Sequence, residues 1–182
     1  MEESKLQSRY AQSLYDLAVE GNKNKVERIF ADMTLINEVC KQNHLFEVVL
    51  KDPIIKPLKK KDILMSLFED RCDELTIKFL YLIVSKRRDI YLRGISEAFI
   101  IIYRQQHGIK LATLTTAGEI DKKDLDSIRQ KLETELNCKI EMRVKKDDSL
   151  IGGFCVDVDG RRYDASFVRK LEDIRKNITK QI

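Results

Sequence analysis

The sequence has few of the residues on which catalytic and metal sites are built. Its 182 residues include two histidines and no tryptophan, and His44 and His107 have no neighbours at the spacing of metal ligands. No CxxC pair occurs, and the cysteines are scattered at Cys40, Cys72, Cys138 and Cys155. Each cysteine lies among apolar or helix-forming residues, which favours reduced thiols over disulfides. We therefore expect neither a metal nor a cofactor.

Patterns of nucleotide binding and nucleophilic catalysis are also missing. Gly152 and Gly153 precede an alternating run, and no Gly-Lys-Ser/Thr of a phosphate-binding loop follows them. No serine stands between two glycines, as a nucleophile elbow requires. The paired carboxylates, Asp147-Asp148 and Asp157/Asp159, fall in predicted loops or on an exposed strand face, where solvated charges are the usual interpretation. The sequence predicts that the protein is not an enzyme.

Long apolar runs are absent. The longest are FLYLIV (79–84) and AFIIIY (98–103), whereas a helix that spans a bilayer needs about 20 apolar residues. The first residues, MEESKLQ, are polar and acidic and have no apolar signal segment. We expect the protein to stay in the compartment where it is made.

Charge is plentiful but evenly distributed, and the formal net charge is +4. Residues 1–108 carry 18 basic and 16 acidic side chains, and residues 109–182 carry 16 and 14. A nucleic-acid-binding protein usually concentrates its positive charge on one element. The one basic cluster of note is Lys59-Lys60-Lys61, which has two interpretations: a solvated helix start that Asp62 balances, or a phosphate contact. The pattern favours the first.

Helical spacing predicts that residues 1–108 form a bundle of about six helices. The DPIIKP segment interrupts this pattern, because proline inside a helix removes a backbone hydrogen bond. Gly108 is expected to end the last helix in the left-handed conformation. The predicted helices run from Ser4 to Gly21-Asn22, from Lys23 to Gln42, through HLFEVVL after Asn43, from about Lys60, from Glu74 to Lys86, and from Asp89 to Gln106.

After Gly108 the pattern changes to alternation, which is typical of half-buried strands. Strands are expected at 109–118, 139–147 and 153–158, with a helix between the first two that Asp121 caps. Asp159-Gly160 is a strong hairpin signal after the third strand. Asp164 or Ser166 is expected to cap a final amphipathic helix with Val168, Leu171, Ile174 and Ile178. The predicted fold class is α+β: a six-helix bundle over 1–108, then a small α/β domain over 109–182 in the order strand, helix, strand, strand, helix.

Two helices carry more apolar surface than one-sided burial requires. The first helix has seven apolar residues over about 180°, although a core-facing stripe needs only about 100°: Leu6, Tyr10, Ala11, Leu14, Tyr15, Leu17 and Ala18. The helix with FLYLIV is apolar on all sides. Two interpretations stay open: these are central core helices, or they leave a groove for another helix.

Three segments of the chain, in order, resemble the δ subunit of bacterial F-type ATP synthases, the counterpart of mitochondrial OSCP. They are RYAQSLYDLAVE (9–20), FLYLIVSKRRDIYLRGISEAF (79–99), and DSLIGGF (148–154) followed by Asp164, Ser166, Arg169 and Leu171. The resemblance covers nearly the whole chain. It departs from the family at Ala165, where glycine is usual, and at LTTA (114–117), which only approximates the first-strand signal.

The resemblance implies a stator component without a cofactor, which links the catalytic α/β hexamer to the peripheral stalk at the cytoplasmic face of the bacterial inner membrane. It also implies that the first and fifth helices bind N-terminal helices of α subunits, and that the second domain binds the stalk subunit b. The α-binding candidates are Tyr10, Ala11, Leu14, Tyr15, Ala18, Leu80 and Ile83. The candidates for b are Leu150 and Ile151. Gly152, Gly153, Asp159 and Gly160 are expected to form structural turns.

Two alternatives belong to other classes of function. A strand–helix–strand–strand–helix domain can bind RNA, but an RNA-binding sheet normally displays aromatic side chains on which bases stack. IKLATLTTAG has none, and GFCVDVDG has only Phe154. The other alternative is an enzyme whose site has no recognisable motif.

Overall fold

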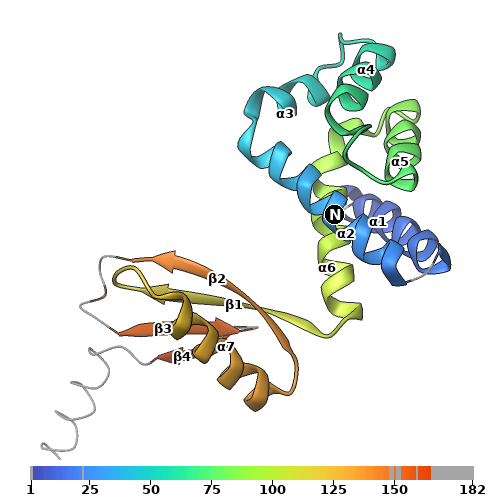
Figure 1. Cartoon of the computed structure of the whole chain (residues 1–182). Coiled ribbons are helices and arrows are strands. Elements are labelled where there is room, and N and C mark those ends of the chain that lie inside the picture. The colour runs from blue at the N-terminus through green and yellow to red at the C-terminus, as the bar shows by residue number, and fades with distance from the viewer. Residues whose placement is uncertain (1, 22, 148–149, 151–152, 159, 165–182) are drawn as a thin grey trace, which may run out of the picture. The chain divides into compact units, whose positions relative to one another are not determined.

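Helical spacing in the first part of the chain and alternation in the second give the predicted α+β fold class (Figure 1). The structure is a computed structural model that describes residues 2–21, 23–147, 150, 153–158 and 160–164. The chain divides into two compact units, Met1–Arg104 and Gln105–Ile182. Each unit is described by itself below. Within the described residues, no helix has the length and apolar character needed to cross a membrane.

The first unit consists of helices joined by short connections. Their bounds are α1 (Glu2–Gly21), α2 (Lys23–Gln42), α3 (His44–Lys51), α4 (Pro57–Phe68), α5 (Glu74–Ser85), the 3₁₀ turn η1 (Asp89–Tyr91) and α6 (Leu92–Gln106). The side chain of Asn43 caps α3 by accepting a hydrogen bond from the Phe46 N–H, at 3.2 Å. Gly108, with φ of 61°, has the left-handed conformation expected just beyond α6.

Two helices begin three residues away from their predicted starts. Helix α4 begins at Pro57, three residues before the predicted start at Lys60. Proline fits the first position of a helix because its missing N–H would have no intrahelical partner there. The segment predicted as one helix from Asp89 begins instead as the 3₁₀ turn η1, and α6 starts at Leu92.

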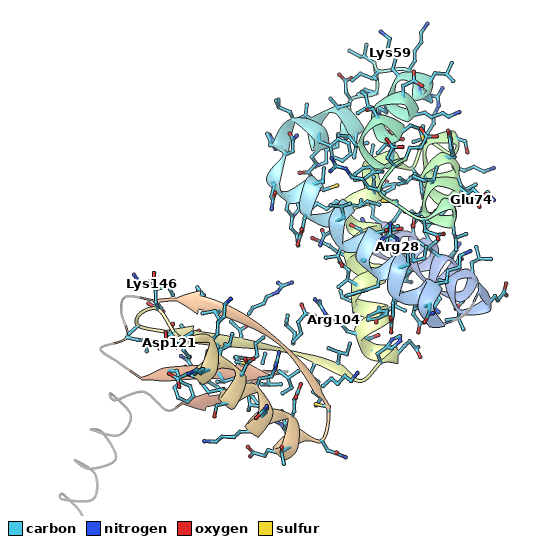
Figure 2. The ribbon with its side chains drawn as sticks, viewed as in Figure 1. Arg28, Lys59, Glu74, Arg104, Asp121 and Lys146 are labelled. Carbon is cyan, nitrogen blue, oxygen red and sulfur yellow. The ribbon has the colours of Figure 1, made fainter. Side chains whose placement is uncertain are left out.

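The three lysines at the start of α4 have three different environments, and the prediction of a solvated helix start is wrong for one of them. Lys60 is buried, and its ammonium donates hydrogen bonds to Asp89 Oδ2 at 2.5 Å and to the Leu50 carbonyl at 2.6 Å. Lys61 lies over the ring of Tyr81, 4.2 Å from its centroid. Lys59 is exposed and points away from the helices (Figure 2). Lys60 therefore joins α4 to the end of α3 and to η1.

The second unit is a four-stranded sheet with a helix packed on one face. Its elements are β1 (Ile109–Thr116), α7 (Lys122–Leu136), β2 (Lys139–Lys146), β3 (Phe154–Val158) and β4 (Arg161–Asp164). The strand order is β2-β1-β3-β4; β1 and β2 are parallel, and the other pairs are antiparallel. A parallel pair needs a long crossover connection, which α7 supplies. The core of this unit contains Ala112, Leu114, Leu132, Ile140, Val156 and Val158.

The structure contains a fourth strand, β4, which the predicted order of strand, helix, strand, strand, helix does not include. Val158 pairs with Arg161, and Gly160 has φ of 77°, so β3 and β4 form a hairpin at the predicted turn. Asp121 occupies the predicted N-cap position of α7, but its side chain makes no capping hydrogen bond. The predicted last helix, with Val168, Leu171, Ile174 and Ile178, lies outside the described residues.

The buried ion pair of Lys60 and Asp89 gives a prediction for stability. Asp89→Asn leaves the Lys60 ammonium buried without its counter-charge, which we expect to lower the free energy of unfolding by about 3–5 kcal/mol. Replacing both residues with apolar ones, as in Lys60→Met/Asp89→Leu, removes both desolvation costs and should restore most of that loss. Urea unfolding measures both changes. The control is Lys59→Met, on the exposed neighbour, with an expected change within about 0.5 kcal/mol. Equal losses in the single and double variants would contradict this account.

Candidate protein-binding surfaces

Most of the residues predicted to contact a partner helix lie in the interior of the first unit. Tyr10 alone among the seven is partly exposed. The buried residues are Ala11, Leu14, Tyr15, Ala18, Leu80 and Ile83. In this structure the bundle covers them, so they offer little or no surface to a partner. The sequence left two interpretations of the apolar surface on α1 and α5: central core, or a groove for another helix. These six side chains belong to the core.

A partly exposed apolar strip lies beside these buried residues, where α1 meets α5. The rings of Tyr10 and Phe79 pack edge to face with 6.5 Å between centroids, which gives a side-chain contact between the two helices. Leu17 follows Tyr10 at helical spacing on the same flank of α1, and its side chain is 50% exposed. On α5, Leu82 lies three residues after Phe79 and is exposed, and it also lines the groove between α4 and α5. We call this strip the α1/α5 face; it comprises Leu6, Tyr10, Leu17, Leu75 and Leu82.

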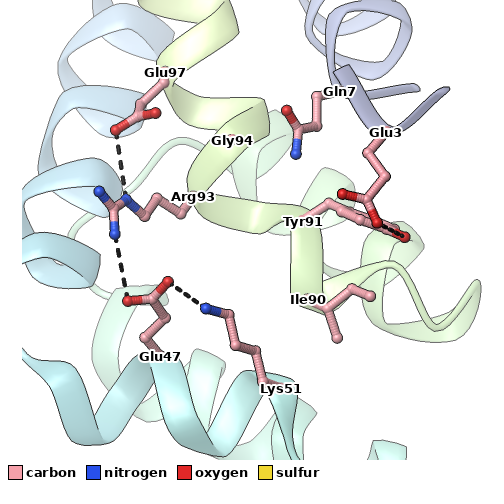
Figure 3. Close-up of a pocket in the computed structure, with 9 residues that line it drawn as sticks. All are labelled: Glu3, Gln7, Glu47, Lys51, Ile90, Tyr91, Arg93, Gly94 and Glu97. Atoms are coloured by element: carbon pink, nitrogen blue, oxygen red, sulfur yellow. Dashed lines mark hydrogen bonds and ion pairs between the residues drawn. The ribbon is translucent and has the colours of Figure 1, made fainter. Parts of the chain in front are cut away.

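A polar pocket of about 520 Å³ lies between α1, α3 and α6 (Figure 3). A chain of charges crosses it: Glu47 accepts a hydrogen bond from Lys51 at 2.8 Å, Arg93 lies 3.4 Å from Glu47, and Glu97 lies 3.5 Å from Arg93. The hydrogen bond from Lys51 holds the pKa of the Glu47 carboxyl below its usual value.

These charges neutralise one another across the pocket. Its lining, which consists of described residues, contains no serine, cysteine or histidine to act as a nucleophile or base. We interpret the pocket as an ion-pair network that ties α3 to α6, not as an active site.

An apolar groove of about 470 Å³ lies in the second unit beside α7. Its apolar lining comes from Ile120, Ile128 and Leu132 on the side of α7, and from Phe154 and Val156 on β3. Polar side chains border it: Asp124, Ser127, Lys131 and Glu135. An apolar floor with a charged rim suits the apolar side of a helix.

The loop before β3 is described only in part. Leu150 is half-buried, and its N–H donates to the Asp147 carbonyl at 3.2 Å. Gly153 has φ of 81°, in the left-handed region that favours glycine. Ile151, Gly152 and Asp159 lie outside the described residues, so their predicted roles stay predictions.

The described residues contain no group of three histidine, cysteine or acidic side chains that could hold a metal ion. The cysteines are free thiols. Burial raises the pKa of the Cys40 thiol to about 11, and it raises that of Cys72, which is partly exposed, to about 11 as well.

Comparison with known proteins gives one consistent family. The family model described as "ATP synthase delta (OSCP) subunit" matches residues 6–178. The chain is 35% identical to the ATP synthase subunit delta of Cytophaga hutchinsonii over 182 residues, which covers 100% of this chain and 98% of the relative. It is 32% identical to that of Desulforamulus reducens over 170 residues, which covers 93% of each.

The fold also matches a solved structure. A chain of the Toxoplasma gondii mitochondrial ATP synthase hexamer superposes with a TM-score of 0.68 over 96% of this chain and 97% of that one. Sequence identity in that match is 21%, so the likeness concerns the fold alone.

The raised pKa values of Cys40 and Cys72 predict slow thiol alkylation in the folded chain. A rise from 9.0 to about 11 lowers the reactive thiolate fraction about 100-fold near pH 8. We expect iodoacetamide to modify both residues at least about 100-fold more slowly in native buffer than in urea. Peptide mass spectrometry measures each rate, with the urea sample as the control. Similar rates in the two solvents would contradict the burial of these thiols.

Proposed function

The chain belongs to the ATP synthase delta (OSCP) subunit family, and from this membership we propose how its two units divide the task of connecting the synthase. The protein is a non-catalytic stator component of F-type ATP synthase, which links the catalytic α/β hexamer to the peripheral stalk. In our proposal the first unit binds N-terminal helices of α subunits, and the second binds the stalk subunit b. The subunit then lies at the cytoplasmic face of the bacterial inner membrane, as a peripheral part of the complex.

The α1/α5 face supports the first contact. It presents Leu17 and Leu82 to solvent, with the half-buried ring of Tyr10 on the same flank of α1 as Leu17 and in contact with Phe79 of α5. Such a strip can receive the apolar side of an amphipathic helix. In this proposal the six buried residues among the seven predicted ones do not touch the α subunit. They pack in the core and so position α1 and α5, which carry the contact residues. Leu17 and Leu82 become the contact residues, together with Tyr10.

The sheet gives no support to RNA binding. The face of the sheet away from α7 carries Ile109, Leu111, Thr113 and Thr115 from β1, and the register places Cys155 and Asp157 of β3 beside them. Among the described residues of β1, β2 and β3, this face has no aromatic side chain on which a base could stack.

The contact with the α subunit is tested by titrating the full chain calorimetrically with a peptide that copies the N-terminal helix of the α subunit from the same organism. Leu17→Asp places a charge on the α1/α5 face, and we expect it to weaken binding at least tenfold, or about 1.4 kcal/mol. The matched control is Val19→Asp: Val19 is 51% exposed on the same helix, but about 200° around it from Leu17. Equal binding by the two folded variants would exclude the α1/α5 face as the docking site. Leu14 is unsuitable for this test because a charge at a fully buried position is expected to unfold the bundle.

The contact with subunit b is tested in the same way on the second unit. Leu150 is half-buried in the loop before β3. We expect Leu150→Asp to weaken binding of the full chain to purified subunit b at least tenfold, because it replaces apolar contact with a charge. The control is Val144→Asp, at an exposed apolar position on β2. Surface plasmon resonance measures both. Unchanged binding by Leu150→Asp, with the protein folded, would move the contact elsewhere, and the groove beside α7 would then be tested through Ile128.

A further inference from the structure

A second apolar surface lies at the end of the first unit where α4 begins and α5 ends. It contains two adjoining grooves that share Pro57, one of about 440 Å³ between α4 and α5, the other of about 380 Å³ between the α3–α4 connection and η1. The side chains of Leu58, Tyr81 and Leu82 line the first groove, and Ile54 and Ile90 line the second. We call the two grooves together the Pro57 surface.

Large apolar side chains are highly exposed on this surface. Ile54 is 87% exposed and Leu58 is 71% exposed, although both belong to a unit that buries most of its large apolar residues. Single exposed apolar residues are common on proteins and need no explanation. Here, however, several gather around two grooves, which is the pattern that marks interaction sites.

Positive charge is concentrated on the same surface. The lining of the two grooves includes one acidic residue, Asp89, whose charge the buried Lys60 balances. Two other lining cations, Lys51 and Lys78, are paired with glutamates on their own helices. The remaining lining cations are Lys56, Lys61 and Arg87. The lining therefore has an excess of cations, although residues 1–108 as a whole carry nearly equal numbers of basic and acidic side chains. Asp52 adds one carboxylate beside the second groove, where it accepts a hydrogen bond from the Ile54 N–H at 2.8 Å.

The fold fixes the start of α4 and the position of Arg87 at this surface. The ion pair between Lys60 and Asp89 fixes the start of α4 against η1. Arg87 has φ of 54°, in the left-handed region that favours glycine, where it ends α5 with its N–H donating to the Val84 carbonyl at 2.9 Å. An arginine in that conformation costs about 1–2 kcal/mol relative to glycine. The hydrogen bond to the Val84 carbonyl fixes the position of Arg87 at the end of α5, and Arg87 lines the second groove.

We propose that the Pro57 surface binds an acidic amphipathic helix of another subunit of the synthase, independently of the α1/α5 face. The apolar side of that helix fills the two grooves against Ile54 and Leu58, and its carboxylates pair with Lys56, Lys61 and Arg87. Grooves between packed helices suit a helix, and the excess of cations selects an acidic one. Lys61 is held on the ring of Tyr81, a fixed position that matches an ordered row of carboxylates better than mobile lipid headgroups.

The chemistry of the partner is tested with a synthetic 18-residue helical peptide that carries leucine at i, i+3, i+4 and i+7 and glutamate on its other faces. A second peptide has lysine in place of glutamate. We expect the full chain to bind the glutamate peptide at least tenfold more tightly than the lysine peptide. The preference should weaken as salt is raised, because exposed charges are screened. Equal binding of the two peptides, or tighter binding to phosphatidylserine vesicles than to the glutamate peptide, would overturn the proposal.

The site is located with variants that avoid Leu82, since that residue borders both surfaces. Leu58→Asp and Lys56→Glu should each reduce binding of the glutamate peptide at least tenfold. The control is Leu45→Asp on α3, because Leu45 is 76% exposed but does not line either groove. Leu17→Asp, on the α1/α5 face, should leave this binding unchanged. A loss with Leu17→Asp and none with Leu58→Asp would assign the peptide to the α1/α5 face and contradict a second site.

The surface is then examined in the assembled synthase by amide hydrogen exchange. In the intact complex, compared with the free chain, we expect slower exchange in residues 54–61 and 86–88, which exclude Leu82 because it borders both surfaces. Slower exchange on α1 alone would support the α-subunit contact proposed above while excluding the Pro57 surface. Slower exchange at the Pro57 surface alone would support binding there and exclude the α-subunit contact at the α1/α5 face. The measurement can therefore reject either proposal without the other.

Discussion

The buried ammonium of Lys60 is the interaction on which the geometry of the first unit depends most. It contacts the Leu50 carbonyl, 10 residues before it in the sequence, and Asp89, 29 residues after it, so it joins the end of α3, the start of α4 and η1. A buried ion pair contributes little net stability, because removing two charges from water offsets most of their attraction. Its effect here is on geometry: it holds the start of α4 against η1 and the end of α3. The second groove of the Pro57 surface lies where these segments meet, and Lys60 and Asp89 are among its lining residues.

The same helices hold the bundle together and present its surfaces, with the two tasks assigned to different flanks. On α1, Leu14 is fully buried while Leu17, three residues on, is half exposed. On α5, Leu80 is buried and Leu82 is exposed. A helix places residues three or four apart on neighbouring positions and residues two apart nearly opposite one another. A continuous apolar helix can therefore supply both core and contact residues without any change of composition.

A stator component needs contacts that resist force, and it needs no reactive groups. The ion pairs of Glu47, Arg93 and Glu97 connect helices instead of activating a substrate (Figure 3). Two binding surfaces on one unit, which adjoin at Leu82, would make the attachment stronger than either alone, because the second contact forms at a high effective concentration once the first has formed. The apolar groove beside α7 offers the second unit a surface of similar kind.

The sequence by itself determined the fold class, most helix and strand positions, the hairpin before β4 and the family, because spacing, turn residues and motifs are local signals. It did not determine which apolar residues face solvent: periodicity shows that α1 and α5 are apolar but not which helices cover them. The tertiary structure decided that Leu14 is core and Leu17 is surface. It also decided that Lys60 is buried beside Lys59, which is exposed, because the partner of Lys60 is Asp89, a residue that only folding brings within reach.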